Sequence, residues 1–212
     1  LATAGAAVGL GNIWRFPYLA AEYGGGIFLL TYLLLVFSAG FVLVLTESAL
    51  GRMTGSGVLC AYEKISRKLS FAGYLTFITP LIIFSFYSVV GGWVMFYALQ
   101  FIFGNGSLLA DSGYFSAFTA EPVIPAVFTL IFIALTAWIV LRGVRRGIEK
   151  TTRLLMPVLL VMLVVLAAYC ICMPGGLDGL WYFFYPDFSK FSAALVLAAL
   201  GQMFFTLMIG SG

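Results

Sequence analysis

The sequence predicts an all-α membrane protein that crosses the bilayer several times. Of its 212 residues, 63% are hydrophobic and only 9% are charged, and the mean hydropathy is +1.10. Apolar runs of about 20 residues, the length that a helix needs to cross a bilayer, follow one another along the chain. The Lys and Arg residues gather in two of the connections between these runs. Such a composition excludes an ordinary soluble domain.

Six segments are apolar enough to be spanning helices. The first is rich in Gly and Ala, and we expect it to be broken near 8–11. The fourth has two prolines suited to a first helical turn, and Pro174-Gly175-Gly176 ends the fifth. The last stops part-way across, so we expect a single transmembrane domain, 1–212, that is part of a longer protein. The expected helices are roughly 1–23, 27–53, 71–103, 122–141, 148–173 and 190–212.

The connections differ in charge. Segments 52–68 and 142–153 hold nine of the eleven Lys and Arg residues, four in the first and five in the second. Cytoplasmic loops carry such an excess of basic residues. We therefore expect a plasma-membrane protein with a cytoplasmic N-terminus, and loops 104–121 and 174–190 on the outer side.

Enzymatic chemistry has little support in this composition. Histidine is absent, which excludes histidine-based proton relays, metal sites and catalytic triads. The three cysteines do not suggest a disulfide pair, and no nucleophile stands beside an obvious base. We expect a protein that is not an enzyme and has no nucleic-acid partner, with membrane lipid as its surroundings.

The stretch GAAVGLGNIWRFP, residues 5–17, opens the first span with weak helix formers. Glycine costs about 1 kcal/mol in a helix relative to alanine, so Gly5, Gly9 and Gly11 favour unwinding. Unwound carbonyls can ligate a hard cation such as Na⁺, and amides at a helix N-terminus suit a carboxylate. The alternative is close helix packing through Gly5-xxx-Gly9. Asn12 could add an oxygen to the same cation, or join two helices.

The stretch GQMFFTLMIGSG, residues 201–212, repeats this pattern with Gly210-Ser211-Gly212. Two spans interrupted by glycine predict a binding site near the middle of the membrane. With the motif of residues 5–17, this stretch resembles the neurotransmitter:sodium symporters of the bacterial leucine-transporter type. The resemblance runs along the whole chain and includes RGVRRGIEK at 142–150.

The resemblance implies the fold and the function. The chain would be the first five-helix repeat of an inverted-repeat transporter plus the start of helix 6, with helices 1 and 6 discontinuous. The protein would move an amino acid with Na⁺ by alternating access, and the missing C-terminal half would complete it. Two other functions remain open: a membrane receptor that binds an amino acid without moving it, and an inactive structural fragment.

The resemblance also implies a sodium and substrate site. The first sodium would be bound by the Ala7 carbonyl and the side chains of Asn12 and Thr206, and the second by the carbonyls of Gly5 and Val8. The expected substrate-binding residues are Ala7, Gly9, Leu10, Gly11, Ile83, Tyr87, Phe205, Thr206, Met208 and Ser211.

Within that set, the amides of Leu10 and Gly11 and the Tyr87 hydroxyl would face the substrate carboxylate. Phe205 would cover the substrate and form a gate with Arg15, while Ile83 and Met208 would line the side-chain pocket.

Two further features bear on specificity and support. Monoamine transporters of the family have Asp where Gly9 stands, so a substrate here should keep its own carboxylate. The largely apolar lining favours a hydrophobic or aromatic amino acid, although Met208 and Ser211 depart from the usual residues at their positions. Tyr32, Gln202 and Thr206 match positions of a chloride site, and chloride use stays open.

Glu47 lies within the second span, where a carboxylate marks a functional candidate. Our hypothesis is that it accepts hydrogen bonds from unwound backbone in helix 6, as structural support. The outer loop 104–121 lacks the cysteine pair of many animal relatives, which favours a bacterial inner membrane.

Overall fold

In the computed structural model, Gly9 and residues 11–210 are described, apart from the side chains of residues 144–146. The described residues are nearly all helical, and an isolated bridge between Gly25 and Pro186 is their single β-type contact. The chain divides into two compact units, one of residues 1–77 and 152–212 and the other of residues 78–151. We describe each unit by itself.

Four stretches of the described chain are long and apolar enough to cross a membrane: Gly26–Thr54, Arg67–Ile102, Val123–Leu141 and Gly147–Cys172. The first combines α3 (Gly26–Leu35), a π-helical turn η2 (Val36–Gly40) and α4 (Phe41–Thr54). α6 (Ser70–Ile102), α9 (Val123–Leu141) and α10 (Lys150–Cys172) form most of the others. A shorter apolar helix, α12 (Ala193–Thr206), follows near the end of the described chain. The predicted all-α, polytopic fold is therefore confirmed.

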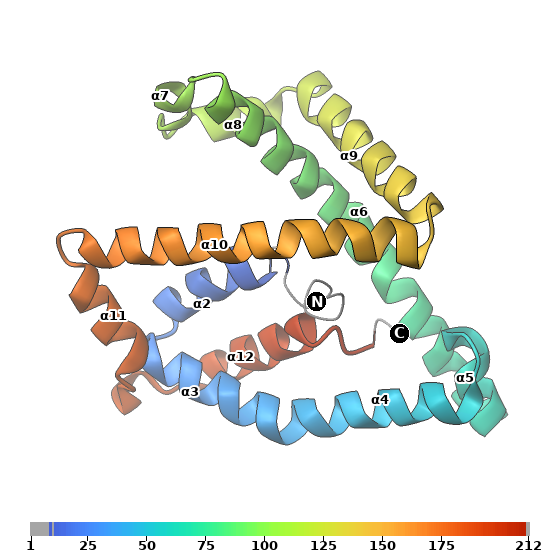
Figure 1. Cartoon of the computed structure of the whole chain (residues 1–212). Coiled ribbons are helices and arrows are strands. Elements are labelled where there is room, and N and C mark those ends of the chain that lie inside the picture. Colours follow the sequence, from blue (N-terminus) through green and yellow to red (C-terminus); the bar gives the residue numbers. More distant parts are fainter. Residues whose placement is uncertain (1–8, 10, 211–212) are drawn as a thin grey trace. The chain divides into compact units, whose positions relative to one another are not determined.

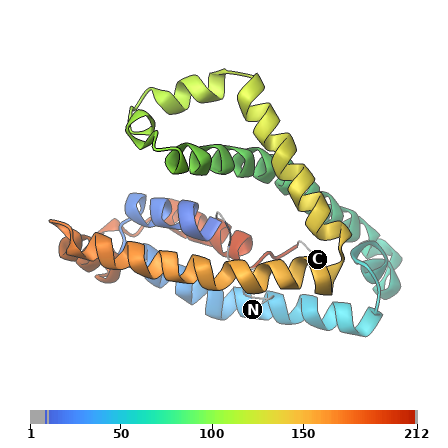
Figure 2. The ribbon, with the colours of Figure 1, turned by 45° about the horizontal axis from the view of Figure 1, so that its top comes forward.

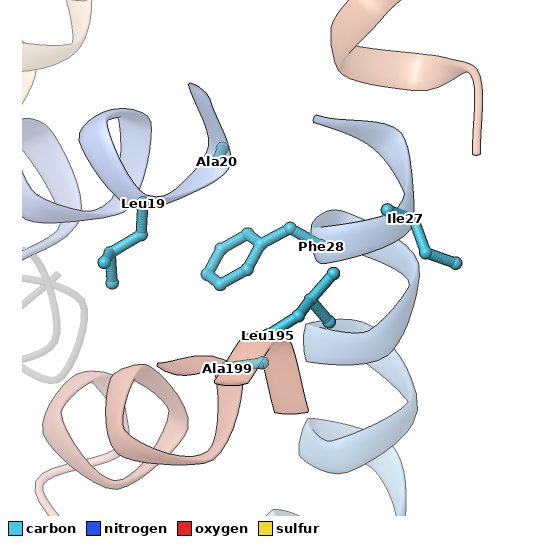
Figure 3. Packing of buried hydrophobic residues seen from close by; sticks show 6 residues of the cluster. All are labelled: Leu19, Ala20, Ile27, Phe28, Leu195 and Ala199. Carbon is cyan, nitrogen blue, oxygen red and sulfur yellow. The ribbon is translucent and has the colours of Figure 1, made fainter. Parts of the chain in front are cut away.

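The core of the first unit lies where three helices meet. α2 (Phe16–Glu22) contributes Leu19 and Ala20, α3 contributes Ile27 and Phe28, and α12 contributes two buried residues more (Figure 3). Phe28 is fully buried, and its ring lies edge-on to Phe16 at 5.6 Å. This cluster fixes α2 against the other two helices, so the residues just before α2 are held beside α12.

Glycines 24–26 allow a short helix, α11 (Gly176–Phe184), to approach the start of α3. Gly25 has φ +60°, and a Cβ there would lie 2.2 Å from the carbonyl oxygen of Tyr182. A Cβ at Gly26 would meet the Tyr185 backbone at 2.4 Å. The two segments can pack this closely because neither glycine carries a side chain.

α4 ends at Thr54, and its capping residue, Gly55, has a φ of +56°, the left-handed conformation common at helix ends. The α5 helix (Val58–Ile65) and the turn η3 (Arg67–Leu69) lead from there to α6. Lys64, in the last turn of α5, donates a 3.0 Å hydrogen bond to the Thr54 carbonyl. That contact gives an exposed carbonyl at the end of α4 a charged partner.

The second unit contains most of α6, then α7 (Gly106–Leu109), α8 (Tyr114–Ala120), α9 and a π-helical turn η4 (Val144–Glu149) (green to yellow in Figures 1 and 2). Stacked rings of Phe96 and Phe118, 4.5 Å apart, hold α8 on α6. α6 and α9 cross closely at Gly92, where a Cβ would lie 2.6 Å from the backbone nitrogen of Thr129.

Candidate functional site

The first expected span is described at Gly9 and from Gly11 onward. Gly9 lies in a bend, and its carbonyl accepts hydrogen bonds from the backbone nitrogens of Asn12 (3.0 Å) and Ile13 (3.2 Å). A π-helical segment, η1 (Gly11–Arg15), begins two residues later and continues into α2. π-Helical turns widen the backbone and are frequent at functional sites. Within the expected break at 8–11, the described residues are Gly9, which lies in a bend, and Gly11, which begins η1.

The second interruption lies at the end of α12. The helix ends at Thr206, after which the Met208 nitrogen donates to the Phe205 carbonyl (3.3 Å) and the Ile209 nitrogen to the Phe204 carbonyl (3.1 Å). These two bonds form a Schellman motif, which normally places glycine in its left-handed position. Here that position is Met208, with φ +53°. The chain therefore leaves the helical path sharply at this point.

Side chains of α12 join these two interruptions. Gln202 donates from Nε2 to the Gly11 carbonyl (2.9 Å) and to Thr206 Oγ1 (3.2 Å). Thr206 in turn donates from Oγ1 to Asn12 Oδ1, at 2.9 Å. Two backbone breaks far apart in the sequence are thereby connected by one polar network inside an apolar unit.

Gln202 is fully buried, and its amide orientation follows from its partners. The Gly11 carbonyl can only accept, so the amide nitrogen must face it. The other amide atom, Oε1, is buried and has no hydrogen-bond partner among the described residues. Both hydrogens of the amide are engaged by Gly11 and Thr206, which leaves an acceptor rather than a donor at this position.

The two residues expected to form a gate lie together. The Arg15 guanidinium carbon is 5.8 Å from the centre of the Phe205 ring, within the range of a cation–π contact. The same ring lies against Gly11, where a Cβ would be only 2.1 Å from a ring carbon. The absence of a side chain at Gly11 therefore allows Phe205 to cover the start of η1.

The segment after α12 is supported from α4 and η2. The Gly210 nitrogen donates to Glu47 Oε1 at 2.6 Å, which is the type of contact that our hypothesis for Glu47 requires. A Cβ at Gly40 would lie 2.5 Å from a methyl group of Leu207. The segment 207–210 after α12 thus contacts a carboxylate of α4 and packs closely against Gly40 of η2.

The structure brings together in the first unit most of the expected site residues that it describes, which are Gly9, Gly11, Asn12, Arg15, Glu47, Phe205, Thr206 and Met208. Ile83 and Tyr87 lie on α6 in the other unit. Gly5, Ala7, Val8, Leu10 and Ser211 are outside the described residues.

The network also contains contacts that sequence reasoning missed. The bond between Gln202 and Gly11 was not expected, nor was the close approach at Gly40. A polar Gln202 within an apolar run was the available signal for the first, because buried polar groups in membranes need partners. No comparable signal marks Gly40 in the sequence.

A family model named "Sodium:neurotransmitter symporter family" matches residues 1–106 and 123–212. The chain belongs to this family. The matched ranges contain Gly11, Asn12, Gln202 and Thr206, and the match confirms the predicted resemblance.

The relatives in this family include bacterial, archaeal and human proteins. An "Uncharacterized sodium-dependent transporter YhdH" of Bacillus subtilis is 34% identical over 99% of this chain and 48% of its own length. A sodium-dependent transporter of Methanocaldococcus jannaschii, MJ1319, is 32% identical over 100% of this chain and 45% of its own. The human sodium- and chloride-dependent GABA transporter 2 is 28% identical over 100% of this chain and 42% of its own.

Among solved structures of the family, the fold matches that of MhsT in complex with L-phenylalanine. The TM-score is 0.88 at 39% identity, over 99% of this chain and 49% of MhsT. The chain spans about half the length of the relatives that it matches. Its multi-pass membrane character follows from the family and from the four long apolar helices.

Proposed function

We propose that this chain provides the first half of a transporter that moves Na⁺ and an amino acid inward together by alternating access. One observation carries the proposal: Thr206 Oγ1 and Asn12 Oδ1 meet at 2.9 Å, where two interrupted helices are joined. A packing motif alone would not need side-chain oxygens to converge at both breaks. Their convergence supports the transport function over a purely structural use of the glycines.

Na⁺ would be the driving substrate. Hard cations take uncharged oxygens at distances of about 2.3–2.6 Å, as known for Ca²⁺, so two oxygens 2.9 Å apart can share one ion. Asn12 and Thr206 would contribute side chains, and the carbonyls of Ala7, Gly5 and Val8 would complete two sodium sites.

The second substrate would be an amino acid whose carboxylate faces the start of η1. Helix N-termini carry positive partial charge and unpaired amides, which suit an anionic group. The Phe205 ring packs directly against Gly11 and covers the start of η1. The family resemblance alone assigns a carboxylate contact to the Tyr87 hydroxyl and a side-chain pocket to Ile83, Met208 and Ser211. The L-phenylalanine bound by MhsT supports a hydrophobic or aromatic side chain.

Coupling would come from the closeness of ion and carboxylate. Each would raise the affinity of the other, typically by about 1–3 kcal/mol. The membrane potential adds about 2.3 kcal/mol per charge for each 100 mV. Chloride use stays open, although Gln202 already donates both amide hydrogens to protein atoms.

Uptake of radiolabelled L-phenylalanine into proteoliposomes containing the native full-length protein tests the proposal. Uptake should require Na⁺ outside and should be lost when choline replaces it. Unlabelled tryptophan should compete, whereas tryptamine, which lacks the carboxylate, should not. Equal uptake in both buffers would exclude symport, and equal competition by the two indoles would exclude the carboxylate contact. Asn12→Ala should reduce the Na⁺-dependent uptake, because Asn12 is a proposed sodium ligand. Asn105→Ala, a change outside the site, is the matched control and should keep that uptake.

A further inference from the structure

α11 (Gly176–Phe184) follows the long helix α10 after a tight turn. Gly175, with φ +80°, redirects the chain immediately before α11 begins. The helix runs crosswise to α10 and reaches the start of α3 (Figure 1). α10 is long and apolar enough to span the bilayer, and a helix crosswise to the end of a spanning helix would run along the membrane surface.

One side of α11 packs against α2 and the residues before α3, which belong to the same unit. The Tyr182 hydroxyl donates to the Ala21 carbonyl at 2.9 Å, and the Phe183 ring lies 6.5 Å from that of Phe16. The Lys190 ammonium also lies on this side, 4.9 Å from the centre of the Tyr182 ring. Tyr182 and Phe183, which are adjacent in the sequence, thus make these contacts from one side of α11.

The opposite side is apolar and exposed. Leu177, Trp181 and Phe184 follow at helical spacing and are 68%, 68% and 63% exposed. The Trp181 ring stacks on Tyr185 at 5.2 Å. The charged residue of this helix, Asp178, lies at the flank of the exposed face, and Asp187 and Lys190 follow after the helix.

We propose that this exposed face of α11 lies in the membrane–water interface, with its partner the lipid at the boundary of headgroups and acyl chains. Trp and Tyr are enriched at this depth because their rings have an apolar body and a polar edge. An apolar helix face set parallel to the membrane binds there by burying its side chains about 5–10 Å deep. The continuity of α11 with the end of a spanning helix selects lipid over a soluble partner.

Placed there, α11 would connect the lipid surface to the residues before α3. Tyr182 contacts the end of α2, through Ala21, and Gly25, which directly precedes α3. A lipid-bound α11 would therefore hold the far end of α2 at a constant depth, while the η1 end of the same segment carries the proposed site.

Site-directed spin labelling in lipid nanodiscs tests this placement. Leu177→Cys and Phe184→Cys would be labelled in the full-length protein after replacement of the native cysteines Cys60, Cys170 and Cys172 by Ser. Val161→Cys, exposed in the middle of α10, and Asp187→Cys, after the helix, are the matched controls. At positions 177 and 184, the ratio of oxygen collisions to nickel-chelate collisions should lie between the two controls and several-fold above that of position 187.

Two results would overturn the proposal. A ratio equal to that at position 187 would place the face in water, and low collision rates with both reagents would place it under protein. A second measurement needs no labelled cysteine: lipids brominated near the headgroup should quench tryptophan fluorescence more in the native protein than in Trp181→Phe. Equal quenching of both proteins would also contradict the placement.

Discussion

Gln202 Nε2 and the carbonyl oxygen of Gly11 lie 2.9 Å apart and join segments separated by 191 positions in the sequence. The bond is buried in an apolar unit, where the carbonyl has no water to replace a lost partner. Gln202 therefore connects the start of η1 with α12, and the two interrupted segments should respond together when either is changed.

Gln202→Met should weaken this connection. Methionine has a similar length but cannot donate, so the Gly11 carbonyl would lose its bond from Gln202, and the loss of such a hydrogen bond costs about 0.5–1.5 kcal/mol. We expect a lower Tm in detergent and a higher Na⁺ concentration for half-maximal uptake, because Thr206 also loses a partner. Gln100→Met, on α6 in the other unit, is the control. An unchanged sodium dependence would show that the bond does not support the ion site.

Gly11→Ala should displace the ring of Phe205. The added Cβ would lie 2.1 Å from a ring carbon, and overpacking of this kind typically costs about 1–3 kcal/mol. We expect the variant to lose amino-acid binding in an equilibrium binding assay, with a lower Tm.

The matched control for that change is Gly201→Ala, also in the first unit. A Cβ at Gly201 meets no described atom within 4 Å, and alanine favours the helix by about 1 kcal/mol over glycine. Gly201→Ala should leave binding intact and the Tm equal or higher. Similar losses in both variants would contradict the role assigned to the Phe205 ring.

Glu47→Gln should destabilise the segment after α12. The amide keeps an acceptor for the Gly210 nitrogen, but hydrogen bonds to charged groups contribute about 1.5–3 kcal/mol, against about 0.5–1.5 for neutral ones. We therefore expect a reduced uptake rate and a Tm lowered by a loss of about 1 kcal/mol. Glu63→Gln, on the exposed side of α5, is the control. Native uptake and stability in Glu47→Gln would refute the support hypothesis.

The sequence was sufficient for the fold class, because the apolar length of each segment is a local property. The pairing of Asn12 with Thr206 came through family resemblance, not from spacing, since nothing local relates positions so far apart. The Gln202–Gly11 bond and the approach of Leu207 to Gly40 depend on how α12 docks against η1 and η2. Such contacts are decided by tertiary packing, which a single sequence does not encode in any short window.

The left-handed conformation of Met208 predicts which of two replacements, glycine or alanine, gives the more stable protein. Met208→Gly and Met208→Ala remove the same side chain, but alanine must still adopt φ +53°. Left-handed backbone costs residues with a Cβ about 1–2 kcal/mol, so the glycine variant should have the higher Tm. At Leu207, with φ −83°, the order should reverse, because glycine there only adds entropy to the unfolded chain.

Thermal unfolding of the glycine and alanine variants at positions 207 and 208, in one detergent and at one sodium concentration, tests whether the order of their Tm values reverses between the two positions. If alanine were the more stable replacement at both positions, the Schellman motif that ends α12 would not be the conformation the protein adopts. The end of α12 at Thr206 would then need another explanation. So would the contact between Gly210 and Glu47, because the chain reaches Glu47 only after it turns at Met208.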